Sequence, residues 1–326
     1  MNIGFFIRHF TERGTETATY DYARYNEELL GNKSYIICFT EQKQKEINFP
    51  STRVSYSKFK NRFEILEIND ISEMKEIISN KCLTHFYTLT HGGEDIYNFN
   101  NKNIWNNCKT IKHCVFNTTH NESDCYICIE DYLNKHYNTK VSVVPHIIHF
   151  SNNNNENLRE KLNIPQSAIV LGRHGGSNTF NIKYVYDCIK ETIICNKNIY
   201  FLFLNTDKFY EHEHIIYLEK TTNDIEKQKF INTCDAMIHA RLDGETFGIS
   251  IGEFSIKNKP IITTNNGHFA HVNIMKNKAI LYNNKEELID IFNNIETIIN
   301  SRTDWNVYKD YSPEKVMKQF KEICLD

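Results

Sequence analysis

Two glutamates stand on either side of a short apolar stretch about three quarters of the way along the chain. In GETFGISIGEF, residues 244–254, Glu245 and Glu253 are separated by seven residues that are mostly apolar or small. Ionised carboxylates accept hydrogen bonds and donate none, so they suit hydroxyl groups rather than a phosphate, at about 1.5–3 kcal/mol per charge-assisted bond. The pair therefore predicts contacts with a ligand that carries hydroxyl groups at two places.

The residues around this pair predict a strand, a loop and the start of a helix. AMIHA at 236–240 is typical of a strand, and FGISIGEFSIK is typical of a helix that begins at the carboxyl edge of a parallel sheet. A phosphate at such a helix end would meet the helix dipole and the first backbone N–H groups, those of Phe247, Gly248 and Ile249. We therefore expect a diphosphate between two polyols, a ribose toward Glu253 and another sugar toward Glu245.

Apolar runs typical of strands alternate with helical patterns along the whole chain. In the first half such runs lie at 3–7, 34–39, 84–90, 110–116 and 141–145, with a helix from near Gly14 to Gly31. After the polar run SNNNNENL the strand runs lie at 168–172, 199–205, 214–220, 236–240, 260–264 and 279–283. The helical patterns of this half lie at 181–194, 223–234, 270–277, 285–299 and 312–325. This alternation predicts βαβ units with right-handed crossovers and parallel sheets.

With 326 residues the chain is longer than one typical domain. We predict an α/β protein with two doubly wound Rossmann-like domains that face each other across a cleft. The first would span residues 1–150 and the second residues 151–305. Residues 306–326 would form a C-terminal helix that packs back on the first domain.

The composition narrows the choice of partners. A net charge of -3 provides no broad attraction to nucleic acid or to anionic lipid. The 10 cysteines are scattered and are expected to be reduced thiols; Cys125 and Cys128 have C-x-x-C spacing, but no second pair follows at the distance of a zinc site. No apolar run approaches the ~18 residues of a membrane helix. We expect a cytoplasmic protein that binds no metal.

The segment CDAMIHARLDGETFGISIGEFSIKNKPIIT, residues 234–263, resembles the nucleotide-sugar site of retaining glycosyltransferases of the GT-B fold. The likeness is to family 4, also called group 1, in which two glutamates are separated by seven residues and Phe-Gly follows the first. VSVVPHIIHF resembles the interdomain strand of that family, and AIVLGRHGG resembles the first strand of its donor-binding half. The resemblance implies that residues 1–150 form the acceptor side and residues 151–305 the donor side.

The resemblance implies roles for several residues of the second half. Glu245 would support the donor sugar, Glu253 would bind the ribose, and Arg173 would hold the diphosphate. Thr179 stands where the family has a lysine, so Lys183 is the nearest candidate cation. The alternatives are a loop charge for Glu245, a solvated helix position for Glu253 and a surface salt bridge for Arg173.

Three residues of the first half are further candidates. Gly14 lies in a loop that resembles the family's glycine-containing loop near donor phosphate and acceptor, although a plain helix start is an equal alternative. His113 resembles the histidine near the reacting sugar, with an ordinary core or surface histidine as the alternative. His91, which is followed by two glycines, is assigned to the acceptor side.

Together these features predict a retaining, metal-independent glycosyltransferase. It would move a sugar from a nucleoside-diphosphate sugar to a hydroxyl group of a glycan or other acceptor, and the departing phosphate would take the proton. One alternative is a nucleotide-sugar-binding protein whose catalysis has decayed, because the family's lysine is absent. A further alternative is a sugar-nucleotide epimerase, which can have the same architecture. The sequence does not specify the sugar, the base, the acceptor or the oligomeric state.

Overall fold

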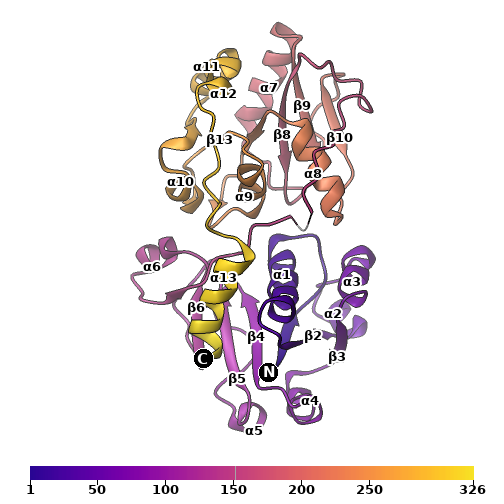
Figure 1. Ribbon diagram of the computed structural model, residues 1–326, viewed down its shortest axis with the longest axis vertical. Coiled ribbons are helices and arrows are strands. Elements are labelled where there is room, and N and C mark those ends of the chain that lie inside the picture. Colours follow the sequence, from indigo (N-terminus) through magenta and orange to yellow (C-terminus); the bar gives the residue numbers. More distant parts are fainter. Residues whose placement is uncertain (151) are drawn as a thin grey trace. The chain divides into compact units, whose positions relative to one another are not determined.

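The structure is a computed structural model that describes residues 1–150 and 152–326. Contacts divide the chain into two compact units. Unit 1 comprises Met1–Ile147 together with Tyr311–Asp326, and unit 2 comprises Ile148–Asp310. Figure 1 labels the elements of both units.

Unit 1 is built on a seven-stranded parallel sheet in the order β3-β2-β1-β4-β5-β6-β7. Its strands are β1 (Asn2–Ile7), β2 (Lys33–Phe39), β3 (Glu64–Ile68), β4 (His85–Thr90), β5 (Lys109–Cys114), β6 (Cys125–Cys128) and β7 (Ser142–Val143). The chain runs outward from β1 to β3 and then restarts at β4 on the other side of β1. This doubly wound order places a switch point between β1 and β4, where ligands bind in many sheets of this kind.

Both faces of the unit 1 sheet are covered. The helices are α1 (Gly14–Glu28), α2 (Glu41–Glu46), α3 (Arg53–Lys60), α4 (Met74–Lys81), α5 (Lys102–Trp105), α6 (Asp131–Tyr137) and α13 (Pro313–Phe320). A 3₁₀ turn, Ile71–Glu73, precedes α4, and a π-helical turn, Lys321–Leu325, follows α13. Successive strand residues point to opposite faces, so Phe5 lies in one apolar cluster and Phe6 in another. This burial on both faces is why the strands are apolar throughout.

The C-terminal helix α13 belongs to the core of unit 1. Val316, Met317 and Phe320 are buried in the same apolar cluster as Tyr22 of α1 and Tyr87 of β4. The ring of Phe320 lies 5.2 Å from that of Tyr22 and 5.7 Å from that of Tyr87. The last segment of the chain therefore completes a core that begins at the first strand (Figure 1).

Unit 2 contains a six-stranded parallel sheet in the order β10-β9-β8-β11-β13-β15. Its strands are β8 (Ile169–His174), β9 (Ile199–Leu204), β10 (Ile215–Leu218), β11 (Ala236–Ile238), β13 (Ile261–Thr263) and β15 (Ala279–Leu281). The helices are α7 (Lys183–Cys195), α8 (Asp224–Thr233), α9 (Ile249–Ile256), α10 (Ala270–Met275), α11 (Lys285–Asn293) and α12 (Ile295–Asn300), and a 3₁₀ turn, Lys276–Lys278, follows α10. The switch point of this sheet lies between β8 and β11.

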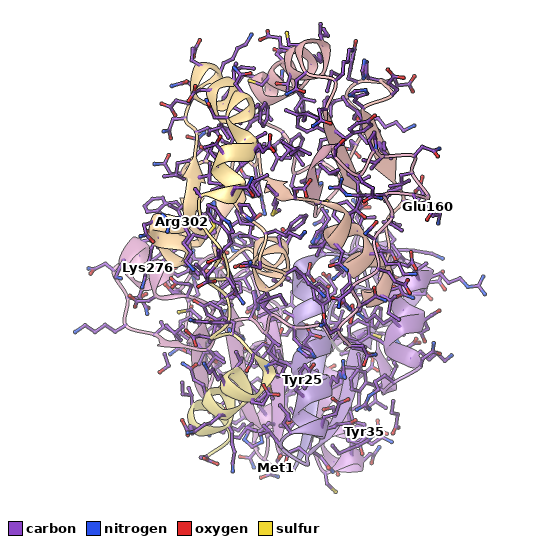
Figure 2. The ribbon with its side chains drawn as sticks, turned by 45° about the horizontal axis from the view of Figure 1, so that its top comes forward. Met1, Tyr25, Tyr35, Glu160, Lys276 and Arg302 are labelled. Atoms are coloured by element: carbon purple, nitrogen blue, oxygen red, sulfur yellow. The ribbon has the colours of Figure 1, made fainter. Side chains whose placement is uncertain are left out.

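A second, two-stranded parallel sheet in unit 2 pairs β12 (Gly244–Glu245) with β14 (His268–Phe269). It holds the loop after β11 against the loop after β13. Figure 2 draws the side chains on the ribbon, and those of Leu171, Phe201 and Ile189 belong to one apolar cluster of unit 2. The predicted α/β class with two Rossmann-like domains is confirmed.

Several local predictions need correction. The strand predicted at 141–145 is only Ser142–Val143, and the helix predicted at 285–299 is two helices that meet at Asn294. Cys125 and Cys128 lie three residues apart in the strand β6, which was not predicted, and so point to opposite faces of the sheet. None of the described helices is both long and apolar enough to cross a bilayer.

Candidate functional site

The amino end of α9 is shaped by a glycine. Gly248 precedes the helix with φ of 87°, a left-handed conformation that favours glycine, and a Cβ atom there would lie 3.1 Å from Cδ1 of Ile251. As the N-cap residue, Gly248 has no side chain that could accept hydrogen bonds from the first N–H groups of the helix. Phe247 is buried against Tyr308, whose hydroxyl donates to the Phe247 carbonyl at 2.7 Å. Phe247 therefore fixes the turn by packing.

Glu245 lies on β12 and is held by two basic side chains. Nη1 of Arg241 lies 3.2 Å from Oε1 and 3.1 Å from Oε2, and Nε2 of His239 lies 3.4 Å from Oε1. Burial favours the neutral acid, but the contacts with His239 and Arg241 prevail and lower the pKa of Glu245 to about 2. The side chain keeps 19% of its surface exposed.

His239 also contacts buried residues on the side of its ring away from Glu245. Its Nδ1 lies 2.9 Å from the hydroxyl of Thr263, and that hydroxyl lies 3.0 Å from Nε2 of His271. The backbone carbonyl of His239 accepts from the Tyr282 hydroxyl at 2.8 Å. Burial, reinforced by His239, lowers the pKa of His271 to about 3, so that ring is neutral at pH 7.

Glu253 is buried beside α8 and the end of β8. Nζ of Lys227 on α8 lies 2.6 Å from Oε1, and Nε2 of His174 at the end of β8 lies 2.9 Å from Oε2. The His174 contact is an ion-pair distance without the alignment of a hydrogen bond. Burial opposes ionisation, yet Lys227 and His174 lower the pKa of Glu253 to about 2.

Arg173 is a buried cation held by neutral groups. Its Nη1 donates to the Asn205 carbonyl at 3.2 Å and the Thr206 hydroxyl at 2.6 Å. Its Nη2 donates to the Gly176 carbonyl at 2.7 Å and the Thr179 hydroxyl at 2.5 Å. Burial lowers the pKa of Arg173 to about 10, which keeps it charged at pH 7.

Thr179 and Lys183 have different surroundings. Thr179, at the position of the family's lysine, contributes a hydroxyl that orients Arg173 instead of a second positive charge. Lys183 is exposed as the first residue of α7. The structure gives it no contact with Arg173 or with the other candidate residues of unit 2.

The candidate residues of unit 1 have different surroundings. His113 is fully buried in β5, and its Nδ1 lies 2.8 Å from the Tyr87 hydroxyl. Burial, reinforced by His146, lowers the pKa of His113 well below its usual range, so the ring is neutral. His113 therefore lies in the buried interior of unit 1.

His91 instead lies on the surface, at a pocket of about 240 Å³. It follows β4 and stacks on Phe116, and Gly92 beside it has φ of 101° with no room for a side chain. The same pocket is lined by His9, Thr15, Glu16, Phe49 and Asp95, among others. Gly14 is the exposed first residue of α1, immediately before two of these residues. The pocket thus joins the ends of β1 and β4 with the start of α1.

Sequence reasoning identified both glutamates but missed the basic residues that hold them. His239 and Arg241 lie within the segment that carries the family resemblance, and a basic residue four positions before a glutamate was a usable signal. Lys227 and His174 gave no such signal, because they reach Glu253 from 26 and 79 residues away, a proximity that only the fold creates.

The fold places the chain in a known class. Two Rossmann-like units, each with a parallel doubly wound sheet, form the GT-B fold that is found among glycosyltransferases. No protein-family profile matches the sequence, and no curated protein matches it. The solved structures therefore provide the comparison.

Three of the similar solved structures are glycosyltransferases or nucleotide-sugar complexes. A glycosyltransferase from Rickettsia africae is 17% identical with a TM-score of 0.69, over 98% of this chain and 94% of that one. Anabaena HepE in complex with UDP-glucose is 14% identical with a TM-score of 0.70, over 99% and 98%. WaaG, a glycosyltransferase involved in lipopolysaccharide biosynthesis, is 11% identical with a TM-score of 0.68, over 99% and 100%.

Proposed function

We propose that the protein transfers a sugar from a nucleoside-diphosphate sugar to a hydroxyl group of an acceptor, with retention of the anomeric configuration. The observation that carries this proposal is the charge of Arg173. Glu245 is paired with Arg241 and Glu253 with Lys227, whereas each hydrogen-bond partner of Arg173 among the described residues is neutral. A buried cation of this kind favours an anion, and a guanidinium matches the oxygens of a phosphate.

The surroundings of Arg173 support a diphosphate in particular. Arg173 is close enough to Glu245 and Arg241 for both to act on its pKa, so it belongs to the same end of the sheet as β12. The uncapped amino end of α9 follows β12 directly. An arginine and a helix amino end together offer donors for two phosphate groups. The GT-B fold and the complexes of HepE with UDP and UDP-glucose support a nucleotide sugar as the source of that diphosphate.

Each candidate residue then has a proposed role in binding. The diphosphate contacts Arg173 and the N–H groups of the residues at the start of α9, which are Phe247, Gly248 and Ile249. Glu245 contacts the donor sugar and Glu253 the ribose. Gly14 and Lys183 are assigned to the nucleotide sugar, and His91 to the acceptor. His113, which is buried, is assigned to the catalytic set only through the resemblance.

In the proposed reaction the oxygen of the acceptor hydroxyl attacks the anomeric carbon from the side of the leaving group. The bond between that carbon and the diphosphate oxygen breaks, and the diphosphate takes the proton of the hydroxyl. Arg173 and the helix amides stabilise the negative charge that develops on the diphosphate. The role of Glu245 is electrostatic, and the mechanism requires no metal.

A second candidate function is nucleotide-sugar binding without transfer. The observation that favours it is Thr179, which replaces a charged lysine with a hydroxyl that is already bonded to Arg173. This candidate predicts binding of a nucleotide sugar with no release of nucleoside diphosphate in the presence of any acceptor. Transfer predicts acceptor-dependent release.

Thermal unfolding with a panel of nucleotide sugars tests the binding step. A donor at 100 times its dissociation constant stabilises the protein by about 2.7 kcal/mol. Arg173→Lys keeps the charge but loses the planar fork, and we expect about tenfold to a hundredfold weaker binding of the nucleoside diphosphate. Arg53→Lys, at the exposed start of α3, is the control.

Three results would contradict parts of the proposal. Failure of all nucleotide sugars to stabilise the protein would reject the proposed class of ligand. Equal affinities of Arg173→Lys and Arg53→Lys for the diphosphate would reject the role of Arg173. Proton NMR of the product linkage reports the anomer, and an inverted product would reject retention alone.

A further inference from the structure

A continuous chain of hydrogen-bonding groups runs behind Glu245. It passes from His271 on α10 to Thr263 on β13, then to His239 after β11, and ends at the carboxylate. His239 is 5% exposed, and Thr263 and His271 are fully buried. Elements that are separate in sequence thus converge on one side of a single carboxylate.

The ionised state of Glu245 determines the direction of the hydrogen bond nearest to it. A carboxylate only accepts, so Nε2 of His239 carries a proton and donates to Oε1. The Thr263 hydroxyl lies between Nδ1 of His239 and Nε2 of His271, within hydrogen-bond distance of both. It therefore ties the ring of His239 to a buried ring on α10.

The contacts leave one carboxylate oxygen more available than the other. Oε1 receives both His239 and Arg241, whereas Oε2 receives Arg241 alone. Because a carboxylate oxygen has two lone pairs, Oε2 retains acceptor capacity, and the side chain is partly exposed. The buried chain and the arginine therefore determine which oxygen of Glu245 faces a ligand.

We propose that His239, Thr263 and His271 are positioning residues that hold Glu245 with Oε2 directed at a hydroxyl group of the donor sugar. This inference rests on the proposed function, since it specifies how the carboxylate assigned to the donor sugar is oriented. Arg241 neutralises the charge and the chain sets the rotation of the carboxylate. None of the three positioning residues contacts the reacting atoms.

Kinetics of Thr263→Val test the proposal, because valine has nearly the shape of threonine but no hydroxyl group to hydrogen-bond with the two histidine rings. We expect kcat to fall about tenfold, the effect of one lost hydrogen bond of about 1.4 kcal/mol, with a change in donor KM of less than about twofold. In a Glu245→Gln background the same substitution should change kcat by less than about twofold. Thr192→Val, a buried threonine of α7 in the same unit, is the control and should leave kcat unchanged.

A second measurement needs no substrate. Proton–nitrogen NMR of histidine-labelled protein reports which ring nitrogens carry a proton, and Nε2 of His239 should carry one. Thr263→Val should change the tautomer populations of His239 and leave thermal stability close to that of the Thr192→Val control.

The outcomes distinguish failure of the positioning role from failure of the proposed function. The lack of a proton on Nε2 of His239, or an equal effect of Thr263→Val with Glu245 and with Gln at 245, would overturn the positioning role. Absence of nucleotide-sugar binding with the expected proton on Nε2 of His239 would reject the proposed function while the hydrogen-bond chain stands.

Discussion

Glu253 shows how a carboxylate can be buried and still ionised. Lys227 occupies one oxygen and His174 approaches the other, while the ring of His174 stacks on Phe254 at 5.7 Å between centroids. A buried charge is tolerated only when it is paired, and removal of one partner leaves the other uncompensated. The orientation of Glu253 therefore depends on α8 and β8 as much as on its own helix.

Replacement of Lys227 tests this dependence. We expect Lys227→Met to lower the free energy of unfolding by about 2–4 kcal/mol, because Glu253 would remain buried without its cation. It should also weaken nucleoside diphosphate binding, since Glu253 would be protonated more easily. Urea denaturation and titration calorimetry measure the two effects.

Lys229→Met is a matched control on the same helix. Lys229 pairs with Glu156 and Glu226, whose side chains are largely exposed, so its loss should shift the urea midpoint much less than the loss of Lys227. Equal urea midpoints for the two variants would show that the Lys227 pair contributes no special stability.

The pKa values of the two glutamates predict loss of stability in acid. In both, the pKa falls from an ordinary value of 4.5 to about 2 in the folded protein. The stabilisation is therefore present above about pH 4.5 and is lost as the pH falls toward 2. By linkage this is on the order of 3 kcal/mol for each group.

Urea midpoints measured between pH 7 and pH 2 test the prediction. The comparison uses Glu253→Gln, which removes one titrating group and should flatten the decline below pH 4.5. A Glu253→Gln curve parallel to that of the unsubstituted protein would mean that the pKa of Glu253 is not depressed by folding.

At the scale of the element, α9 depends on the left-handed turn before it. Gly248→Ala should lower the free energy of unfolding by about 2 kcal/mol, because it combines backbone strain with a 3.1 Å contact to Ile251. Any shift of the turn also moves the first N–H groups of the helix, so nucleoside diphosphate affinity should fall at least tenfold. Thermal unfolding and calorimetry provide both measurements.

Gly31→Ala tests the effect of backbone strain without steric crowding of the new Cβ atom. Gly31 follows α1 with φ of 66° and has no heavy atom within 4 Å of a Cβ position, so alanine there carries the strain alone. We expect about 1 kcal/mol of destabilisation and no change in nucleotide affinity. Equal loss of affinity in both variants would indicate a general loss of folding instead of a local role for Gly248.

The sequence predicted most strands of both sheets, because strands buried on both faces are apolar along their length. It missed β3, an edge strand with a half-exposed alternating sequence, EILEI, and the short β6. Residue types and spacing were enough to select Glu245 and Glu253 as candidates, and their roles stay predictions. Their buried partners could not be predicted, because side-chain contacts between α8, β8 and α9 arise only when the sheet is assembled.

At the scale of the whole molecule, α13 makes unit 1 discontinuous in sequence. The unit begins at Met1 but is completed by residues that follow unit 2 in the chain. The free energy of unfolding of unit 1 should therefore respond to substitutions near the C-terminus. The two tryptophans of the chain allow this to be measured, because Trp105 lies in unit 1 and Trp305 in unit 2.

Phe320→Ala is the informative substitution, because it leaves a cavity between α13 and the buried rings of Tyr22 and Tyr87. We expect about 3–5 kcal/mol of destabilisation, seen in the fluorescence of Trp105 in a Trp305→Phe background. The signal of Trp305 in a Trp105→Phe background should shift much less, and Lys318→Ala on the exposed face of α13 should shift neither. Equal shifts of both tryptophan signals with Phe320→Ala would show that the two units unfold as one cooperative body, in which α13 stabilises the whole chain.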